Sequence, residues 1–262
     1  MKRFMCLLAI LAMLMFVACA KKTTVDDVVN KMTQALGGAE KLASIQDQVG
    51  TWDMVMGGVP MGDSMGTMNG SMAITYKSPS KIKFEGMGPD GSVMFATVFD
   101  GTSGWQMAMG QAREMSPAEI QESTTMAETW VTSFHDYSKK GMTLMLMPDS
   151  MMNGTSYHVI KATDRFGNSS TSYCNTQTGL CERMDGEETN PETQEKQART
   201  IAFSDYAAFD GVMLAKKVVS HDTQGNLMFD ATLREVKHNT GVTDDVFAMP
   251  MVMAPPAADM AK

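Results

Sequence analysis

Short stretches in which apolar and polar residues alternate follow one another along most of the chain, and this pattern constrains the fold most strongly. Outside one segment near residues 116–138, no helical pattern separates these stretches. Strands joined so closely pair antiparallel, because a parallel crossover needs a longer connection. A meander of this length must curl. The period of two predicts strands at residues 49–59, 66–77, 80–88, 92–100, 104–109, 142–147, 156–163, 169–175, 180–185, 199–205, 212–221 and 226–237.

Two helices are predicted beside these strands. Thr24 to Asp27 supplies a cap and early acids for the first, which Gly37 and Gly38 end, and a short turn follows at residues 39–45. Ser116 to Glu119 opens the second, with Pro at its first position, and we expect it to reach about Ser138. The expected fold class is mainly β with α. It is a strongly curved open antiparallel sheet, an unclosed barrel of about 11–12 strands, with both helices over its hollow.

The N-terminus has the layout of a secretory signal. Lys2 and Arg3 precede an apolar run from Phe4 to Ala18. The small Ala18 before Cys19 resembles the lipobox of bacterial lipoproteins, although Phe16 stands where Leu is usual. This resemblance implies cleavage before Cys19 and acylation of that cysteine. An uncleaved membrane anchor is the alternative, and in both cases the rest of the chain lies outside the cytoplasm.

We therefore expect four parts: a signal peptide at 1–18, a tether at 19–24, a single domain at 25–250 and a loose tail at 251–262. The chain has 22 basic and 30 acidic residues, and the leader takes two of the basic ones. This balance argues against nucleic acid and against membrane binding through basic patches. Membrane attachment is expected through the lipid.

Two cysteines remain after the leader and the anchor. Cys174 and Cys181 bracket Asn175 to Leu180, a segment rich in turn-forming residues. Two strands folding back through that turn bring the thiols together, so we expect a structural hairpin disulfide. A redox couple would need a helix N-terminus to lower a thiol pKa, and none is evident here.

Methionine is the compositional anomaly, with 29 residues. Pairs two apart in a strand share a face, and we list them with three aromatic residues as candidates for a hydrophobic cavity: Met54, Met56, Met107, Met109, Met145, Met147, Trp105, Trp130 and Phe134. Three interpretations stay open: ordinary core, an adaptable wall for chain-like ligands, or soft-metal binding of Cu(I). The most metal-like group is Met61, Met65, Met68 and Met72.

Several phrases resemble the bacterial outer-membrane lipoprotein-sorting group, the LolA/LolB-like superfamily. They lie at residues 35–42, 99–105, 203–206, 209–214 and 244–250, and the resemblance covers most of residues 25–250. Where that family often has Leu-Pro, this chain has Leu180-Cys181 and Leu214-Ala215. The resemblance implies an unclosed barrel whose hollow receives acyl chains or other hydrophobic cargo. It brings no catalytic residue and no cofactor.

Other motifs give little support for an enzyme. Gly62-Asp63-Ser64-Met65-Gly66 matches the nucleophile elbow of hydrolases, but a predicted strand follows it instead of the required helix. The four histidines are scattered, without zinc-ligand spacing.

We therefore expect a non-enzymatic, lipid-anchored binding protein of the cell envelope, on the outer membrane facing the periplasm. Its cargo would be a hydrophobic ligand, an acyl chain or a lipoprotein. The alternatives are a methionine-rich Cu(I)-binding lipoprotein and a purely structural envelope protein.

Overall fold

The computed structural model describes residues 22–61, 64–108, 110–189, 193 and 195–249. The expected signal peptide, the anchor at Cys19 and the tail after residue 250 lie outside the described residues.

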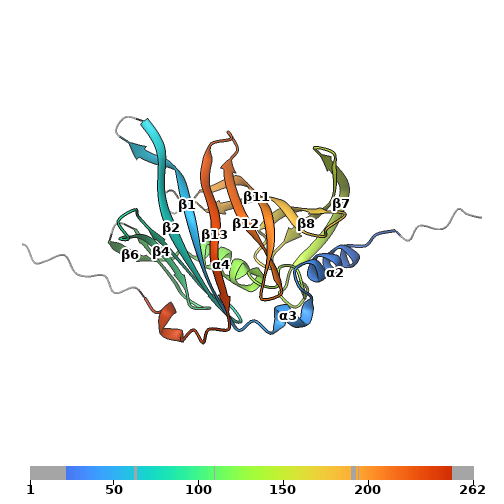
Figure 1. The fold of residues 1–262 in the computed structure, drawn as a ribbon, viewed down its shortest axis with the longest axis horizontal. Coiled ribbons are helices and arrows are strands. Elements are labelled where there is room, and N and C mark those ends of the chain that lie inside the picture. The colour runs from blue at the N-terminus through green and yellow to red at the C-terminus, as the bar shows by residue number, and fades with distance from the viewer. Residues whose placement is uncertain (1–21, 62–63, 109, 190–192, 194, 250–262) are drawn as a thin grey trace, which may run out of the picture.

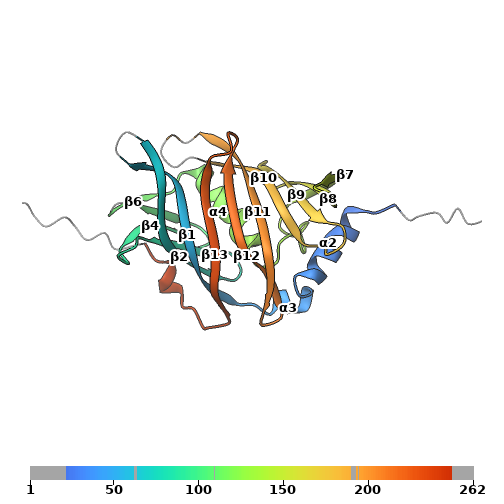
Figure 2. The same cartoon turned by 45° about the horizontal axis from the view of Figure 1, so that its top comes forward.

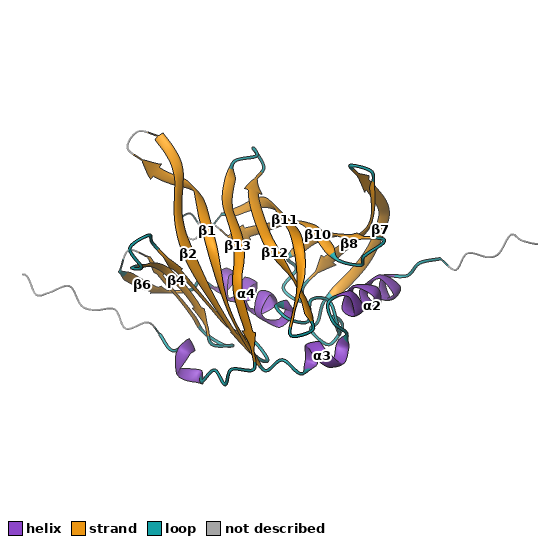
Figure 3. Ribbon diagram, in the orientation of Figure 1, coloured by secondary structure: helices purple, strands orange, loops and turns teal. Residues whose placement is uncertain are grey.

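One antiparallel sheet dominates the described part of the chain (Figures 1 and 3). It has 13 strands in the order β6-β5-β4-β3-β2-β1-β13-β12-β11-β10-β9-β8-β7. Strand β13 lies beside β1, while β6 and β7 form the two edges, so the sheet curls but does not close. The strands are β1 (Asp47–Met61), β2 (Ser64–Lys77), β3 (Lys81–Met87), β4 (Val93–Phe99), β5 (Gly104–Ala108), β6 (Gln111–Glu114), β7 (Thr143–Met152), β8 (Thr155–Thr163), β9 (Ser169–Asn175), β10 (Cys181–Thr189), β11 (Lys196–Phe209), β12 (Val212–Asp222) and β13 (Leu227–His238).

The expected open, curved antiparallel sheet is thus confirmed, with two differences in its strands. Strand β6 was not predicted. The strands predicted at residues 180–185 and 199–205 are longer than expected, because β10 extends to Thr189 and β11 begins at Lys196. The carboxylate of Glu122, in the helix that crosses the hollow, accepts hydrogen bonds from the backbone N–H and the hydroxyl of Thr189. This tertiary contact holds the strand end and leaves no local sequence signal.

Both predicted helices exist. They are α2 (Val25–Ala35), followed by the short α3 (Ala39–Ala43), and α4 (Pro117–Thr129); a 3₁₀ turn, η2 (Asp244–Phe247), follows the last strand. Thr24 and Ser116 each begin their helix with a capping box.

Helix α4 ends earlier than the expected Ser138. Residues 130–141 form turns in which Ser133 and Asp136 have φ of 48° and 56°, values that an α-helix does not allow. The ammonium of Lys140 stabilises these turns by donating to the carbonyl of Ser133 at 2.7 Å. The helical apolar pattern therefore continues past the point where the backbone leaves the helix.

The helices divide the core into three clusters. Helix α4 lies in the hollow of the sheet (Figures 1 and 2), where Ile120, Met126 and Ala127 pack with residues of β1 to β4. Helix α2 packs on β7, β8 and β9, and α3 packs near the start of β12. We call the sheet face that contacts α4 the inner face. Among the described helices, none combines the length and apolar character needed to cross a bilayer.

Candidate functional site

The strand register identifies a continuous apolar surface on the inner face. Trp52 packs with α4 residues, so Met54 and Met56, two and four places further along β1, also face inward. One row of paired residues runs Met184, Ile201, Ser220, Phe229, Met56 and Met68; the next runs Phe203, Val218, Ala231 and Met54. We call these ten residues the inner wall. It spans six adjacent strands from β10 to β2.

Much of the inner wall remains only half-buried. Neighbouring side chains bury Met54, Ile201, Ser220 and Ala231. The other six retain exposed surface: Met56, Met68, Met184, Phe203, Val218 and Phe229. None of these six belongs to the core clusters that the helices form in the described chain. The wall therefore carries apolar surface outside these core clusters.

A close backbone approach shapes one end of the inner wall. A Cβ on Gly57 would lie 1.9 Å from the carbonyl oxygen of Leu227, so β1 can touch β13 here only with glycine. The register between β1 and β2 shifts between Met56 and Val59. A bulge of this kind bends and twists its strand.

Helix α4 is fastened across the hollow by polar contacts at both sides. Arg113, on β6, donates two hydrogen bonds to Glu119, at 2.9 and 2.6 Å. On the other side, Thr125 donates to Asp164 at 2.7 Å and Arg165 donates to Glu128 at 2.8 Å. The helix therefore bridges the two arms of the sheet.

The Glu119 carboxylate has the most strongly shifted acidic pKa of this bridge. Burial by itself raises the pKa of Glu119. Hydrogen bonds from Arg113 and Ser116 lower it by more, so the resulting pKa is about 2. Glu119 is therefore ionised at neutral pH and pairs with Arg113.

A polar rim borders the inner wall. Arg199 lies directly opposite Asp222 and Gly186 in the row next to Ile201. Burial lowers the pKa of Arg199 below its ordinary value, although the charge of Glu122 on α4 acts in the opposite direction. The wall therefore ends on one side at charged residues, which Glu122 of α4 also approaches.

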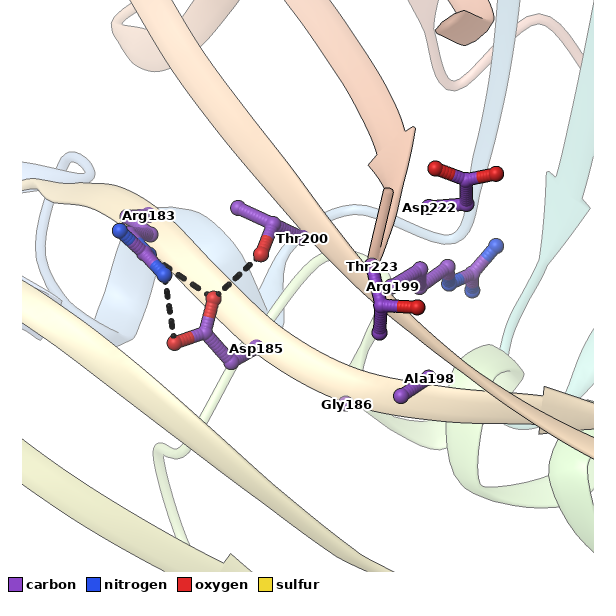
Figure 4. A pocket seen from close by; sticks show the side chains of 8 residues that line it. All are labelled: Arg183, Asp185, Gly186, Ala198, Arg199, Thr200, Asp222 and Thr223. Carbon is purple, nitrogen blue, oxygen red and sulfur yellow. Dashed lines mark hydrogen bonds and ion pairs between the residues drawn. The ribbon is translucent and has the colours of Figure 1, made fainter. Parts of the chain in front are cut away.

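Two small cavities of the described chain lie beside the polar rim and near Trp105. Each holds about 200 Å³, less than the roughly 300–1,000 Å³ of drug-sized ligand pockets. Figure 4 shows the first, where Arg183 holds Asp185 at 2.8 and 3.0 Å and Thr200 donates to the same carboxylate at 2.8 Å. These charges satisfy each other. The inner wall is thus half-buried surface beside the core that α4 forms.

The structure separates the candidate cavity residues. Met54 and Met56 lie on the inner wall, whereas Trp130 and Phe134 belong to the core clusters beneath the helices. Met109 lies outside the described residues.

Four candidates face away from the hollow, contrary to expectation. Leu144 and Leu146 turn toward α2, so Met145 and Met147 occupy the other face, 58% and 37% exposed. Trp105 and Met107 pair with Val98 and Ala96, on the face opposite Phe99. The period of two shows that such pairs share a face, but it does not say which face.

The methionines proposed for Cu(I) do not converge. Met65 is 72% exposed and points away from the face that carries Met68 and Met72. Those two lie four residues apart on one strand, about 13 Å, and the side chain of Met61 lies outside the described residues. Among the described residues, no group of three or more His, Cys, Asp or Glu side chains could hold a metal ion.

The remaining sequence motifs have clear positions. Ser64 begins strand β2, so the hydrolase-like motif leads into a strand and lacks the helix of a nucleophile elbow. Cys174 and Cys181 lie directly opposite each other on β9 and β10, both as free thiols.

Sequence reasoning missed the seven of the ten wall residues that β10 to β13 supply. Met184, Phe203, Val218 and Phe229 each fit an alternating pattern, but only the pairing register shows that they line up with Met56. The alternating pattern was therefore visible within each strand, but the sequence did not show which residues of different strands lie side by side.

The comparisons with known proteins support the fold. No protein-family model matches the chain, and no curated protein matches its sequence. A LolA superfamily protein from Nitrosomonas europaea has a similar structure, with TM-score 0.57, 11% identity and coverage of 86% of this chain and 98% of its own. A DUF1329 family protein from Desulfovibrio piger gives TM-score 0.56, 11% identity and coverage of 86% and 97%.

A domain of the outer membrane lipoprotein-sorting type from Vibrio parahaemolyticus is also similar, with TM-score 0.53, 11% identity and coverage of 84% and 94%. At this identity the likeness concerns the fold alone. The resemblance to the LolA/LolB-like superfamily is thus confirmed at the level of the fold.

Proposed function

We propose that this chain is a lipid-anchored envelope protein, acylated at Cys19, that holds one hydrophobic chain along the inner wall. The observation that carries the proposal is the wall itself: ten paired residues over six strands, six of them half-buried. Soluble proteins seldom leave a contiguous apolar surface uncovered without a binding role. The fold shared with a lipoprotein-sorting domain supports cargo of the acyl-chain class.

The shape and chemistry of the wall favour a flexible, unbranched ligand. Met56, Met68 and Met184 have unbranched side chains that can adapt to an irregular partner. Each CH₂ group removed from water contributes about 0.8 kcal/mol. The polar rim at Arg199 and Asp222 gives an amphiphile a direction, with its polar end at the rim and its chain along the wall residues of β13, β1 and β2.

The tether defines where such a holder works. Residues 20–24 separate Cys19 from the first residue of α2. The six residue-to-residue steps from Cys19 to Val25 reach about 20 Å when the chain is extended. An anchor at Cys19 would keep the inner wall within a few nanometres of the bilayer, roughly the size of the domain itself. This supports a fixed holder or acceptor on the outer membrane, facing the periplasm.

Lipid binding by the purified mature protein tests the proposal. Native mass spectrometry and lipid extraction should find a bound acyl chain, and a fluorescent fatty acid should compete for the same site. The paired variant Met56→Gln/Met68→Gln should weaken binding of the fluorescent fatty acid at least tenfold, because it makes the wall polar.

Met145→Gln/Met147→Gln is the matched control, since both methionines lie on the exposed outer face. This control should leave affinity unchanged. Equal loss in both variants, or no binding by the unaltered protein, contradicts a ligand site on the inner wall.

A further inference from the structure

The cysteine pair occupies the closest type of position in the β9–β10 hairpin. Cys174 and Cys181 are register partners. Next to them, the N–H of Asn175 donates to the carbonyl of Leu180 at 2.9 Å. Hydrogen-bonded and non-hydrogen-bonded pairs alternate along an antiparallel ladder, so the cysteines form a non-hydrogen-bonded pair, with Cα atoms about 4.5 Å apart. Disulfides span about 4.4–6.8 Å between Cα atoms.

The same hairpin forms the seat of helix α2. The Sγ of Cys174 lies 3.9 Å from the Sδ of Met32, which is 1% exposed. The ammonium of Lys31 donates to the carbonyl of Thr176 at 2.6 Å. A Cβ on Gly179 would lie 3.0 Å from the carbonyl oxygen of Lys31, so helix and loop are in close contact. One cysteine and the loop between the two cysteines thus contact the second half of α2.

We propose that Cys174 and Cys181 form a disulfide that restrains the hairpin on which α2 packs, and that Cys181 is the first of the two thiols to react. The oxidant is the disulfide of an extracytoplasmic thiol oxidase. The Cys181 thiolate attacks that disulfide, forms a mixed disulfide and releases one oxidase thiolate. Cys174 then loses its proton and attacks the Cys181 sulfur, releasing the second oxidase thiolate. Two protons and two electrons leave the pair, and the oxidase ends as a dithiol.

Access decides which cysteine reacts first. Cys174 is 1% exposed and lies against Met32, whereas Cys181 is half-buried. Charge favours the same order, because hydrogen bonding from Cys174 lowers the pKa of Cys181 despite burial. The thiolate is the attacking species in disulfide exchange. Cys181 is therefore the entry point and Cys174 the resolving thiol.

The consequence concerns the link between the N-terminus and the sheet. Helix α2 buries Val28, Val29 and Met32 on β7 to β9, and it directly follows the tether. A covalent bond across the base of loop 175–180 restrains the surface on which α2 lies. This inference rests on the export that the proposed function includes, but not on ligand binding, so a protein that binds no fatty acid can still carry the bond.

Peptide mapping of the full chain, exported and purified without reductant, tests the bond. Trypsin cleaves after Arg165 and Arg183, so one peptide, residues 166–183, contains both cysteines. We expect this peptide to escape alkylation and to lack two hydrogens, both changes being reversed by reductant. Alkylation of both thiols without reductant, or a protein that carries a metal on them, overturns the proposal.

Two further measurements test which thiol reacts first and whether the disulfide stabilises α2. An oxidase that lacks its resolving cysteine and is first charged as a mixed disulfide with glutathione should pass to Cys174→Ser, which keeps Cys181, with release of glutathione, and not to Cys181→Ser; the reverse result overturns the order. Reduction of the unaltered protein should speed amide hydrogen exchange in α2 at least tenfold and leave α4 unchanged. Equal exchange in α2 before and after reduction refutes the role as a fastener.

Discussion

At the scale of single residues, Asp47 shows how one carboxylate can hold two distant segments together. It begins β1 and is 4% exposed. Its oxygens accept from the N–H and the hydroxyl of Thr240 at 2.6 and 2.8 Å, and from the N–H groups of Gly241 and Val242 at 2.9 and 3.3 Å. These four donors fix the segment that leads from β13 to η2.

Asp47→Asn should therefore destabilise the fold by about 2 kcal/mol, because hydrogen bonds to charged groups each contribute about 1.5–3 kcal/mol and the amide keeps only one acceptor oxygen. Burial raises the pKa of Asp47, but the hydrogen bonds from Thr240, Gly241 and Val242 lower it below 3.8 overall. The stabilisation is thus present at neutral pH and is lost as pH falls through the lowered pKa.

Urea denaturation at neutral pH and at pH about 3 measures both effects. Asp53→Asn is the control, since Asp53 lies on the same strand in an exposed pair with Arg234 and such pairs contribute about 0–1 kcal/mol. A loss for Asp53→Asn as large as that for Asp47→Asn would contradict the role of the buried network.

At the scale of elements, strand and helix positions follow from the sequence, but their orientation relative to one another does not. Gly179 and Gly211 mark hairpin turns with φ of 78° and 81°, so β9 to β12 were placed within a few residues. Which face of a strand points into the hollow depends on its pairing with neighbouring strands. Met145 was therefore predicted on the wrong face. The end of α4 and the length of β10 depend on Lys140 and Glu122, whose contacts lie outside any local window.

The bridge at the start of α4 predicts an acid-sensitive fold. Glu119→Gln should cost about 1–3 kcal/mol, because Arg113 loses a charged partner. In the unaltered protein the pKa of Glu119 is about 2, below its ordinary 4.5. Its contribution is therefore complete above pH 4.5 and lost as pH falls toward 2.

The melting temperature, measured between pH 7 and pH 2, tests this loss of stability in acid. Glu114→Gln, on the same strand as Arg113 and exposed, should leave the pH dependence of the melting temperature unchanged. If Glu119→Gln retains the acid sensitivity of the unaltered protein, another carboxylate causes it.

The contact of β1 with β13 predicts a difference between two adjacent glycines. Gly57→Ala places a Cβ 1.9 Å from the carbonyl oxygen of Leu227, so the strands must part. Overpacking of this kind costs about 1–3 kcal/mol, and more where backbone must move. Gly58→Ala meets nothing within 4 Å but keeps a φ of 65°, which costs about 1–2 kcal/mol.

Denaturation midpoints should therefore fall further for Gly57→Ala than for Gly58→Ala. Hydrogen exchange at Phe229 and Asp230, which pair with Met56 and Val55, should rise only in the Gly57 variant. The opposite ranking would show that the strands do not touch at Gly57.

At the scale of the whole molecule, the sheet, α4 and α2 form a body that begins after the proposed anchor. Among the described residues, α2 packs on β7, β8 and β9, and Thr24 caps it. These contacts come from residues that follow the proposed anchor. The inner wall likewise comes from β1, β2 and β10 to β13, which all follow the leader.

Cys19→Ser should consequently separate location from folding. Without an acylated cysteine the chain loses its proposed membrane attachment, since the acidic balance of the sequence offers no polybasic substitute. Membrane fractions should lose most of the protein, while its melting temperature and its affinity for the fluorescent fatty acid stay unchanged. A chain that remains in the membrane after an alkaline carbonate wash would instead retain its apolar leader as an uncleaved anchor. A matched Cys6→Ser variant should stay membrane-bound, because that cysteine precedes the cleavage site.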